Sequence, residues 1–492
     1  MERESGATQA TVASAANHSR VQAVGSSSPE GLSNSASHQI RGVIEGFYGQ
    51  PWTFAQRFQM FSFMQQNGFN TYVYAPKDDP YQRAEWWKLY PPGQANEMQR
   101  LVGAAKSDGI QFVYSLSPGI PQPLSNQTLT SEMVNQSITF TSDSDRRQLE
   151  AKINQLRTMG VETFMLSFDD VEKRLKPADQ LKYGNDYARA HANLANQLFQ
   201  DEHRQDPQFQ LWLAPTIYHG LADNHDWQTI RTRLNPAVQV IWTGGWVLNR
   251  QITGQEVAQV TRWLGRKPIL WDNYPVNDYT YVVKQAPALL LGPLENRSAD
   301  LESHLAGYIA NPMIQSEASK IPLATVALFL RDPATYIPTT AWARAVQFMP
   351  GVHDAAALLK FCEYSSQSTL NEAGYAPFAK LAEAYWRAKN VPARQQAELN
   401  LQRELETLAT LGTRLQKSTD NQALLDEINP WLAKLSQEGE AGLLALNYAE
   451  TQPGSQRVVL KQQIDSRLKQ LRNDPRAIGA EVVAFIERVV GQ

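Results

Sequence analysis

Short apolar runs alternate with longer amphipathic stretches between residues 39 and 312. The apolar runs lie at residues 41–49, 71–76, 111–119, 163–170, 209–215, 238–245, 268–275 and 307–313. The stretches between them, such as 54–68, 97–109, 146–160 and 254–266, have helical composition, and several end at a glycine, where helices tend to stop. Strands that alternate with helices are typical of a parallel sheet with helical crossovers.

Eight strand–helix repeats over about 270 residues favour an α/β fold closed into a (β/α)8 TIM barrel. An open, doubly wound sheet is the alternative, but it usually has a glycine-rich phosphate loop after its first strand, and GxGxxG is absent here. In a barrel the active site lies at the C-terminal strand ends. Those ends read EGFYG, APKDD, SLSPG, SFDDV, APTIYH, WTGGW, WDNYPVND and IANPM, so polar, aromatic and glycine residues gather at nearly every one.

The pattern changes after about residue 340. Leucines recur there at helical spacing, as Leu401, Leu405, Leu408 and Leu415, and AAALLKFCEY and FAKLAEAYWRAK look similar. We therefore expect an all-helical C-terminal domain of three to six helices, with Pro430 interrupting one of them. A bundle that packs on the barrel is the main interpretation. A dimerisation or partner-binding surface is the alternative, so a homodimer is one expected assembly.

Residues 1–38 are rich in Ser, Ala and Gly and poor in large apolar groups. They contain no apolar h-region, so they do not indicate a secretory signal peptide, although a trimmed precursor would look the same. Their composition predicts a disordered N-terminal tail. The expected organisation is a tail at 1–38, a catalytic barrel at 39–335 and a helical bundle at 336–492.

The overall composition narrows the classes of partner. A formal net charge of −3 and a pI near 6.3 give no electrostatic reason to expect nucleic acid or an anionic membrane. No run approaches the roughly 18 apolar residues of a transmembrane helix. The single cysteine, Cys362, excludes an intrachain disulfide and a multi-cysteine zinc site. We favour a cytoplasmic location, although a disulfide-free secreted protein would look the same.

Two adjacent carboxylates, Asp169 and Asp170, end the fourth apolar run in FMLSFDDVEK. A helix N-cap beside a solvated acid is the plainest interpretation. A divalent metal site is a second one. Its further ligands would be Asp78, Asp79, Asp272 and Asp278. The interpretation that we favour is acid–base chemistry on a sugar.

Ordinary glycosidases place two carboxylates on opposite faces of the sugar, about 5–10 Å apart. Neighbouring residues on one loop straddle a ring poorly. They suit a substrate that supplies its own nucleophile, because an acetamido group at C2 can attack the anomeric carbon through its carbonyl oxygen and form an oxazoline. The protein then needs one acid at the glycosidic oxygen and one carboxylate at the amide N–H. Such close like charges are expected to raise the second pKa of the pair.

The motifs GVIEGFYGQPW, TYVYAPKDDPY, LSPG, LSFDDV, APTIYH, WTGGWV, WDNYPVNDY and ANP resemble, in this order, those of the family 84 glycoside hydrolases. That family contains the O-GlcNAcases and related bacterial β-N-acetylglucosaminidases, and the resemblance covers about residues 40–330. It implies a retaining hydrolase that removes terminal β-linked GlcNAc from a glycoprotein or glycoside. We expect no cofactor and no metal, because no cluster of His and Cys ligands is evident and a nucleophile supplied by the sugar needs no activated water in the first step. A catalytically silent GlcNAc-binding barrel and a hexosaminidase directed at hyaluronan or the cell wall are the alternatives.

The resemblance also implies roles for single residues. Asp169 would orient and polarise the acetamido group, and Asp170 would be the general acid/base. Gly46 and Lys77 would contact sugar hydroxyls, and Asp278 would accept hydrogen bonds from the 4- and 6-hydroxyls. By residue type alone, Lys77 also suits a surface ion pair, Asp278 an Asx-turn and Gly46 a tight turn.

The remaining contacts follow from the same resemblance. Asn273 and Asn311 would complete the polar contacts. The acetamide pocket would be shaped by Tyr218, Thr243, Val247 and Trp271, although the tryptophan also suits ordinary barrel packing. Ala214 stands where animal relatives carry a cysteine, so we expect a slightly roomier acyl pocket.

Overall fold

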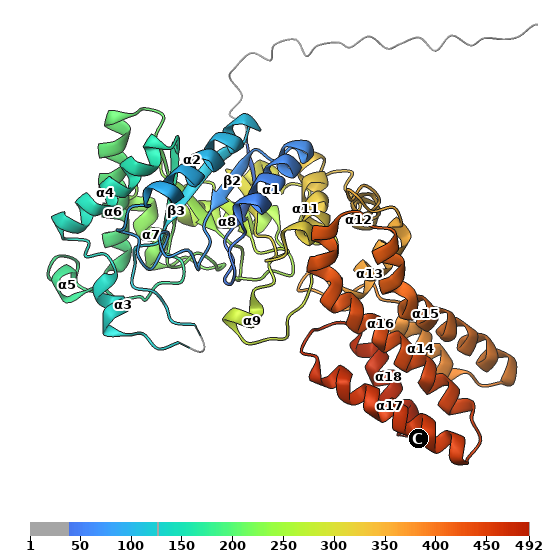
Figure 1. The fold of residues 1–492 in the computed structure, drawn as a ribbon. Helices are drawn as coiled ribbons and strands as arrows, with labels where there is room; N and C mark the ends of the chain where they lie inside the picture. Colours follow the sequence, from blue (N-terminus) through green and yellow to red (C-terminus); the bar gives the residue numbers. More distant parts are fainter. Residues whose placement is uncertain (1–38, 125–126, 492) are drawn as a thin grey trace, which may run out of the picture. The chain divides into compact units, whose positions relative to one another are not determined.

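The computed structural model describes residues 39–124 and 127–491, so the tail expected at 1–38 lies outside the described residues. Eight parallel strands follow one another around a closed barrel in chain order, and the last pairs with the first (Figure 1). The strands are β1 (Ile40–Glu45), β2 (Thr71–Tyr74), β3 (Gln111–Leu116), β4 (Thr163–Ser167), β5 (Gln210–Ala214), β6 (Gln239–Trp242), β7 (Ile269–Asp272) and β8 (Gly307–Ala310). The expected (β/α)8 barrel is confirmed, and the open-sheet alternative is wrong.

Helices α1 to α11 connect the strands or follow the last of them. They are α1 (Phe54–Asn67), α2 (Pro92–Ser107), α3 (Ser131–Gln136), α4 (Asp143–Thr158), α5 (Pro177–Tyr183), α6 (Tyr187–Gln205), α7 (His225–Arg233), α8 (Gly254–Leu264), α9 (Tyr279–Val282), α10 (Leu301–His304) and α11 (Ser316–Arg331). Helix α1 shows how local residues set the start and the end of a helix. Thr53 and Gln56 form a capping box at its start, and Gly68 ends it at a φ of 80°, which favours glycine.

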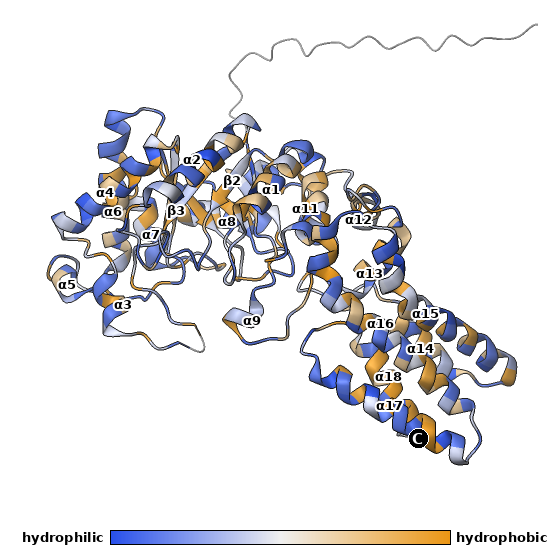
Figure 2. Ribbon diagram, viewed as in Figure 1, coloured by the Kyte–Doolittle hydropathy of each residue, from blue (hydrophilic) through white to orange (hydrophobic). Residues whose placement is uncertain are grey.

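The strand side chains divide between two cores, because successive strand residues point to opposite faces. One core fills the barrel interior and contains Ile44, Val73, Val113, Met165, Trp212, Ile241, Ile269 and Ile309. The alternate residues, such as Val43 and Tyr72, belong to the core between the strands and the helices. Figure 2 shows orange, hydrophobic segments within the barrel and helices on which blue and orange residues alternate. Burial on both faces explains why the strands read as continuous apolar runs.

Buried ion pairs fix the C-terminal ends of two barrel strands. Arg57 on α1 donates to both carboxylate oxygens of Glu45, the last residue of β1, each over 2.8 Å. Arg297 pairs in the same way with Asp272 at the end of β7, over 2.7 and 2.9 Å. Breaking such a buried pair by removing one partner costs about 3–5 kcal/mol. These pairs therefore hold the chain firmly where it enters the loops after β1 and β7.

Beyond α11 the described chain is helical. The helices are α12 (Pro338–Gln347), α13 (Ala355–Tyr364), α14 (Phe378–Arg387), α15 (Val391–Lys417), α16 (Gln422–Glu450), α17 (Ser455–Asn473) and α18 (Ala480–Val490). The expected helical C-terminal region is confirmed, with α12 to α18 making more helices than the three to six expected. None of the described helices is long and apolar enough to cross a membrane.

Helix α16 runs through Pro430, so the interruption expected there is wrong. Proline removes one backbone hydrogen bond and crowds the preceding turn. Ile428, Trp431 and Leu432 on either side are buried, and packing of these flanks outweighs the local cost. The indole N–H of Trp431 also donates to the carbonyl of Pro287 over 3.1 Å.

Contacts between α16 and α11 join the helical region to the end of the barrel. Glu427 on α16 accepts the backbone N–H of Ala318 over 2.8 Å and the hydroxyl of Ser316 over 3.1 Å. The two carboxylate oxygens of Glu427 thus satisfy donors in the first turn of α11, because the residue before this helix provides no side-chain cap. The boundary at residues 335 and 336 stays a prediction.

Candidate active site

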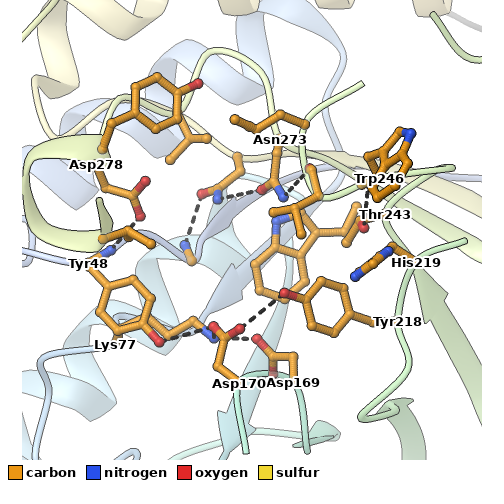
Figure 3. A pocket seen from close by; sticks show the side chains of 18 of the residues that line it. Tyr48, Lys77, Asp169, Asp170, Tyr218, His219, Thr243, Trp246, Asn273 and Asp278 are labelled. Atoms are coloured by element: carbon orange, nitrogen blue, oxygen red, sulfur yellow. Dashed lines mark hydrogen bonds and ion pairs between the residues drawn. The ribbon is translucent and has the colours of Figure 1, made fainter. Parts of the chain in front are cut away.

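One cavity of about 900 Å³ is lined by residues from the C-terminal ends of the barrel strands, where the sequence places the site. The residues to which the family resemblance gives a place in the site all line it, namely Gly46, Lys77, Asp169, Asp170, Ala214, Tyr218, Thr243, Val247, Trp271, Asn273, Asp278 and Asn311, whereas Asp78, Asp79 and Asp272 do not. Figure 3 shows the two aspartates on one side of the cavity and Asn273 on the opposite side. A volume of this size is typical of small-molecule sites.

Asp169 presents an oxygen that has no donor. Strand β4 ends at Ser167, and the chain then turns so that the carboxylate of Asp169 is buried, with 4% of the residue exposed. Its Oδ2 pairs with the ammonium of Lys77 from the loop after β2. Its Oδ1 is buried and accepts no hydrogen bond from any described residue. Because an unpaired buried acceptor is costly, Oδ1 is suited to accept an N–H from a ligand.

Asp170 is held by two hydroxyls and remains accessible. The hydroxyl of Tyr48 donates to Oδ2 over 3.0 Å, and that of Tyr218 donates to Oδ1 over 3.1 Å. The ammonium of Lys77 lies 3.3 Å from Oδ2, and 27% of the aspartate side chain is exposed. Asp170 can therefore meet a ligand atom while its orientation is fixed (Figure 3).

The cations beside Asp170 set the direction of its pKa. Burial alone would raise the pKa, but the charges of Lys77 and Arg83 and the hydroxyls of Tyr48 and Tyr218 outweigh burial and hold the pKa of Asp170 below its ordinary value. The expectation that close like charges raise the pKa is therefore wrong for Asp170. An ammonium that contacts both carboxylates offsets their repulsion.

A chain of hydrogen bonds crosses the opposite wall of the cavity. The backbone N–H of Gly46 donates to Oδ1 of Asn311 over 3.2 Å. The amide of Asn311 donates to Asn273 over 2.9 Å, and the amide of Asn273 donates to the carbonyl of Val247 over 2.8 Å. This chain connects the ends of β1, β8, β7 and β6, so it fixes both asparagine side chains at the cavity wall.

Asp278 lies near the start of α9 and reaches back to β1. Its Oδ2 accepts the backbone N–H of Tyr48 over 2.9 Å. Burial raises the pKa of Asp278 to about 6, against the opposing effects of the Tyr48 N–H and of Lys77. The side chain is thus an acceptor whose charge is lost in mildly acidic solution.

Trp271 packs closely against Gly46 at the apolar part of the cavity. A Cβ atom at Gly46 would lie 2.4 Å from the Trp271 ring, so only glycine fits there. Thr243 is fixed by its backbone N–H, which donates to the carbonyl of Tyr218 over 2.9 Å. At the rim, Trp246 is 72% exposed.

Three residues of the cavity region were missed in the sequence. Tyr48 lies in the same EGFYG motif as Gly46, so the motif carried its signal. Trp246 lies in the WTGGW strand end and lines the cavity. Arg83 lies nine residues beyond the end of β2, in DDPYQRAEWW, where no periodic pattern marks it. It donates to the hydroxyl of Tyr48 over 2.9 Å and to the backbone carbonyl of Asp170 over 2.8 Å.

The acidic residues considered as metal ligands have other partners. Asp78 accepts the backbone N–H of Gly49 over 3.0 Å, and Asp79 accepts the hydroxyl of Tyr90 over 3.1 Å. Asp272 is paired with an arginine, as described above. Within residues 39–124 and 127–491, no three His, Cys, Asp or Glu side chains are placed to hold a metal ion.

Two family models match the chain. The model described as beta-N-acetylglucosaminidase matches residues 41–363, and that described as hyaluronidase post-catalytic domain-like matches residues 378–486. The first match takes in the barrel and every residue named in the cavity, and the second lies within the helical region.

Known proteins similar to this chain agree with these matches. Protein O-GlcNAcase of Mus musculus is 30% identical over 328 residues, which are 65% of this chain and 33% of that protein. The Rattus norvegicus protein of the same name is 30% identical over 314 residues, 63% of this chain and 32% of that protein. The chain thus matches about a third of the length of these relatives. A mutant of the O-GlcNAc hydrolase of Thermobaculum terrenum superposes with a TM-score of 0.82 and 28% identity, covering 92% of this chain and 94% of that one.

Proposed function

We propose, since this chain belongs to the β-N-acetylglucosaminidase family of glycoside hydrolases, that it removes terminal β-linked GlcNAc with retention of configuration. The acetamido group of the substrate is the nucleophile, and the intermediate is an oxazoline. Asp169 and Asp170 are the two catalytic residues in this proposal.

The observation that carries the proposal is the pairing of two unlike carboxylates. Oδ1 of Asp169 is a buried acceptor that no described residue satisfies, whereas Asp170 is hydrogen-bonded and partly exposed. An acetamide N–H is the donor that Asp169 needs. With that N–H on Asp169, the neighbouring side chain of Asp170 is available to a glycosidic oxygen. One side of the sugar then meets both acids, as substrate assistance requires.

In the first step, the acetamide carbonyl oxygen attacks C1 and the bond from C1 to the glycosidic oxygen breaks. A bound sugar excludes water from Asp170, and this further burial raises its pKa, so that Asp170 takes up a proton. Asp170 then transfers this proton to the glycosidic oxygen, and the aglycone leaves as an alcohol. Asp169 accepts the N–H, whose positive character grows as the oxazolinium ring forms. General acid catalysis of this kind contributes about 10²–10⁴-fold.

In the second step, a water molecule attacks C1 from the side that the aglycone left. Asp170, now a carboxylate, takes a proton from the water, and the oxazoline opens to restore the acetamido group. Two inversions at C1 give net retention. The cations and hydroxyls that lower the pKa of Asp170 favour the carboxylate that this step uses.

The polar wall supports recognition of a terminal sugar. Asp278 faces the cavity as an acceptor and suits the 4- and 6-hydroxyls. Asn273 and Asn311 suit further hydroxyl contacts, and their hydrogen-bond chain keeps them from rotating. Gly46 permits close approach of the ring, and Lys77 supplies a donor beside the two acids.

The acetamide methyl group needs an apolar pocket near Asp169. Tyr218, Thr243, Val247 and Trp271 line the cavity and are proposed to form this pocket. Ala214, the last residue of β5, also lines the cavity. Its small side chain supports tolerance of acyl groups slightly longer than acetyl.

We propose that the substrate is a protein with GlcNAc on Ser or Thr, so that the protein is the aglycone, because the relatives named above are O-GlcNAcases. A hyaluronan or cell-wall oligosaccharide is the competing substrate. The two are separated by comparing GlcNAc release from a modified protein with release from an oligosaccharide at equal concentrations of terminal sugar. Faster release from the oligosaccharide would overturn the protein assignment and leave the chemistry standing.

The activity itself is tested with 4-nitrophenyl β-GlcNAc and its α-anomer. We expect hydrolysis of the β-anomer only, and release of the β-anomer of GlcNAc as the first product, followed by NMR. Tight binding without turnover would instead favour the catalytically silent barrel. An α-anomeric first product would contradict retention.

A further inference from the structure

Arg83 contacts both the backbone of Asp170 and the tyrosine that binds the Asp170 side chain. Its Nη1 donates to the hydroxyl of Tyr48 over 2.9 Å, and its Nη2 donates to the backbone carbonyl of Asp170 over 2.8 Å. The donors of a guanidinium group are fixed in one plane, so both acceptors are held relative to each other. Arg83 therefore couples the side chain of Tyr48 to the backbone of Asp170.

The donor direction along this contact is fixed by chemistry. Arginine has no acceptor, so the oxygen of Tyr48 must accept from Arg83. The single hydroxyl hydrogen of Tyr48 is then free to point at Oδ2 of Asp170, 3.0 Å away. Burial raises the pKa of Tyr48 to about 12, so the hydroxyl keeps its proton at neutral pH. The order of donation is Arg83 to Tyr48 to Asp170.

The backbone of Asp170 also needs support. Its φ is 54°, in the left-handed region that residues other than glycine rarely adopt. Such a conformation persists only where the surroundings fix it, and it is frequent at active sites. The carbonyl of Asp170 is held by Arg83 and by the backbone N–H of Gln122, which donates over 2.8 Å.

We infer that Arg83 is a positioning residue for the reaction: through Tyr48 and through the backbone carbonyl it holds the carboxyl of Asp170 toward the glycosidic oxygen. This inference rests on the acid/base role proposed for Asp170. Arg83 acts through these two groups, so it is not itself a catalytic residue. Its loss should weaken proton transfer more than sugar binding.

The charge of Arg83 adds a second, separable effect. The titratable groups that face Asp170 are Tyr48, Lys77, Arg83, Asp169, Tyr218, His219 and Asp278. Among them Lys77 and Arg83 are the cations that favour the Asp170 carboxylate. Removing the charge of Arg83 raises the pKa of Asp170, so the protonated acid persists to higher pH. The basic limb of kcat/KM should then move to higher pH.

The test compares Arg83→Met, Arg83→Lys and Tyr48→Phe in the full chain, with an alkyl β-GlcNAc glycoside and with an acidic aryl β-GlcNAc glycoside. Arg83→Met should lower kcat for the alkyl substrate by roughly 10–100-fold, the effect of losing charge-assisted contacts. KM should change little, and the basic limb of the kcat/KM profile should move to higher pH. Arg83→Lys keeps the positive charge but loses the two donors that a guanidinium holds in one plane. We therefore expect kcat to fall while the basic limb of the kcat/KM profile stays at the wild-type pH.

Tyr48→Phe removes the intermediate hydroxyl and should also lower kcat for the alkyl substrate more than for the aryl one. Arg204→Met is the matched control, because the Arg204 side chain is 75% exposed and its guanidinium pairs with Asp201 over 3.5 Å. It should leave kcat, KM and the pH profile unchanged. Thermal unfolding of each variant checks that the fold is retained.

A purely structural residue would affect both leaving groups equally and would leave the basic limb of kcat/KM at the wild-type pH. The inference is overturned if both Arg83→Met and Arg83→Lys behave in that way. Unchanged kcat in both variants would overturn it too. If Arg83→Met does not fold, the leaving-group effects of Arg83→Lys and Tyr48→Phe decide. Failure of the proposed function looks different, because the wild-type chain would then hydrolyse neither glycoside.

Discussion

The ammonium nitrogen of Lys77 lies 3.3 Å from Oδ2 of Asp170 and also pairs with Asp169. One buried cation thus serves two carboxylates that are adjacent in the chain. Burial opposes the charge of Lys77, but the two carboxylates outweigh burial and raise its pKa. Lys77 therefore stays charged, and both acids can be ionised side by side.

Removal of this cation should impair both residues that we propose to be catalytic. In Lys77→Met the two carboxylates repel each other without compensation, which raises the pKa of Asp170. We expect kcat/KM to fall by roughly 10–100-fold, the effect of losing a hydrogen bond to a charged group. The pH dependence of kcat/KM measures the result, and its basic limb should move to higher pH. Lys106→Met, at a side chain that is 78% exposed, should behave like wild type; the same behaviour in Lys77→Met would contradict the prediction.

Asp170→Ala should discriminate between leaving groups. An alkoxide-like leaving group needs a proton, so its cleavage should fall by about 10²–10⁴-fold, the usual contribution of a general acid. A very acidic phenol leaves without protonation and should lose much less. Single-turnover rates of the glycosylation step provide the comparison. An equal loss with both substrates would show that Asp170 is not the acid.

Asp278 should make sugar binding sensitive to mild acid. Burial raises its pKa to about 6, so the carboxylate is present above that pH and is lost as the pH falls through it. A protonated carboxyl accepts hydroxyl hydrogen bonds less well, and the affinity for free GlcNAc should weaken below pH 6. Inhibition constants of GlcNAc between pH 4.5 and 8 measure this. Asp278→Asn should bind more weakly and show no such dependence; an unchanged pH dependence in this variant would assign the titration to another group.

Gly46→Ala should disturb the sugar pocket through Trp271. The added Cβ would lie 2.4 Å from the indole ring, so the ring must move. Overpacking of this kind costs about 1–3 kcal/mol. We expect a lower unfolding temperature and a higher KM. Gly93→Ala, in helix α2 where a Cβ meets nothing within 4 Å, is the matched control and should neither lower the unfolding temperature nor raise KM. Equal effects of the two substitutions would remove the steric explanation.

Much of the fold was predictable, because apolar runs and helix-capping residues mark strands and helices locally in the sequence. The run at 163–170 is apolar on both faces, which suits a strand buried between the barrel interior and the helices, and β4 lies there. Thr53 and Gly68 marked both ends of α1. Pro430 was misread because its cost is local, whereas the packing that outweighs it involves side chains such as Trp431, which contacts residue 287 far away in the chain.

The site was predictable where a residue belongs to a strand end. Lys77 and Asp170 follow apolar strands directly, so the barrel alone brings them to one edge. Arg83 was not predictable, because its position depends on the path of a loop and on a left-handed residue at 170. The direction of the Asp170 pKa was misjudged for the same reason. The sequence places two acids together, but only the folded chain places Lys77 and Arg83 beside them.

The identity of the nucleophile is the central claim, and an acyl series tests it most directly. Replacing the N-acetyl group of an aryl β-GlcNAc glycoside by N-fluoroacetyl, N-difluoroacetyl and N-trifluoroacetyl withdraws electrons from the attacking carbonyl oxygen. Fluorine is small, and Ala214 leaves space in the cavity, so exclusion by size should not mimic the trend. With the acetamide oxygen as nucleophile, kcat/KM should fall progressively along the series, with a clearly negative slope. A kcat/KM that is insensitive to fluorination would contradict this claim, because an enzyme carboxylate as nucleophile would feel the substitution only weakly.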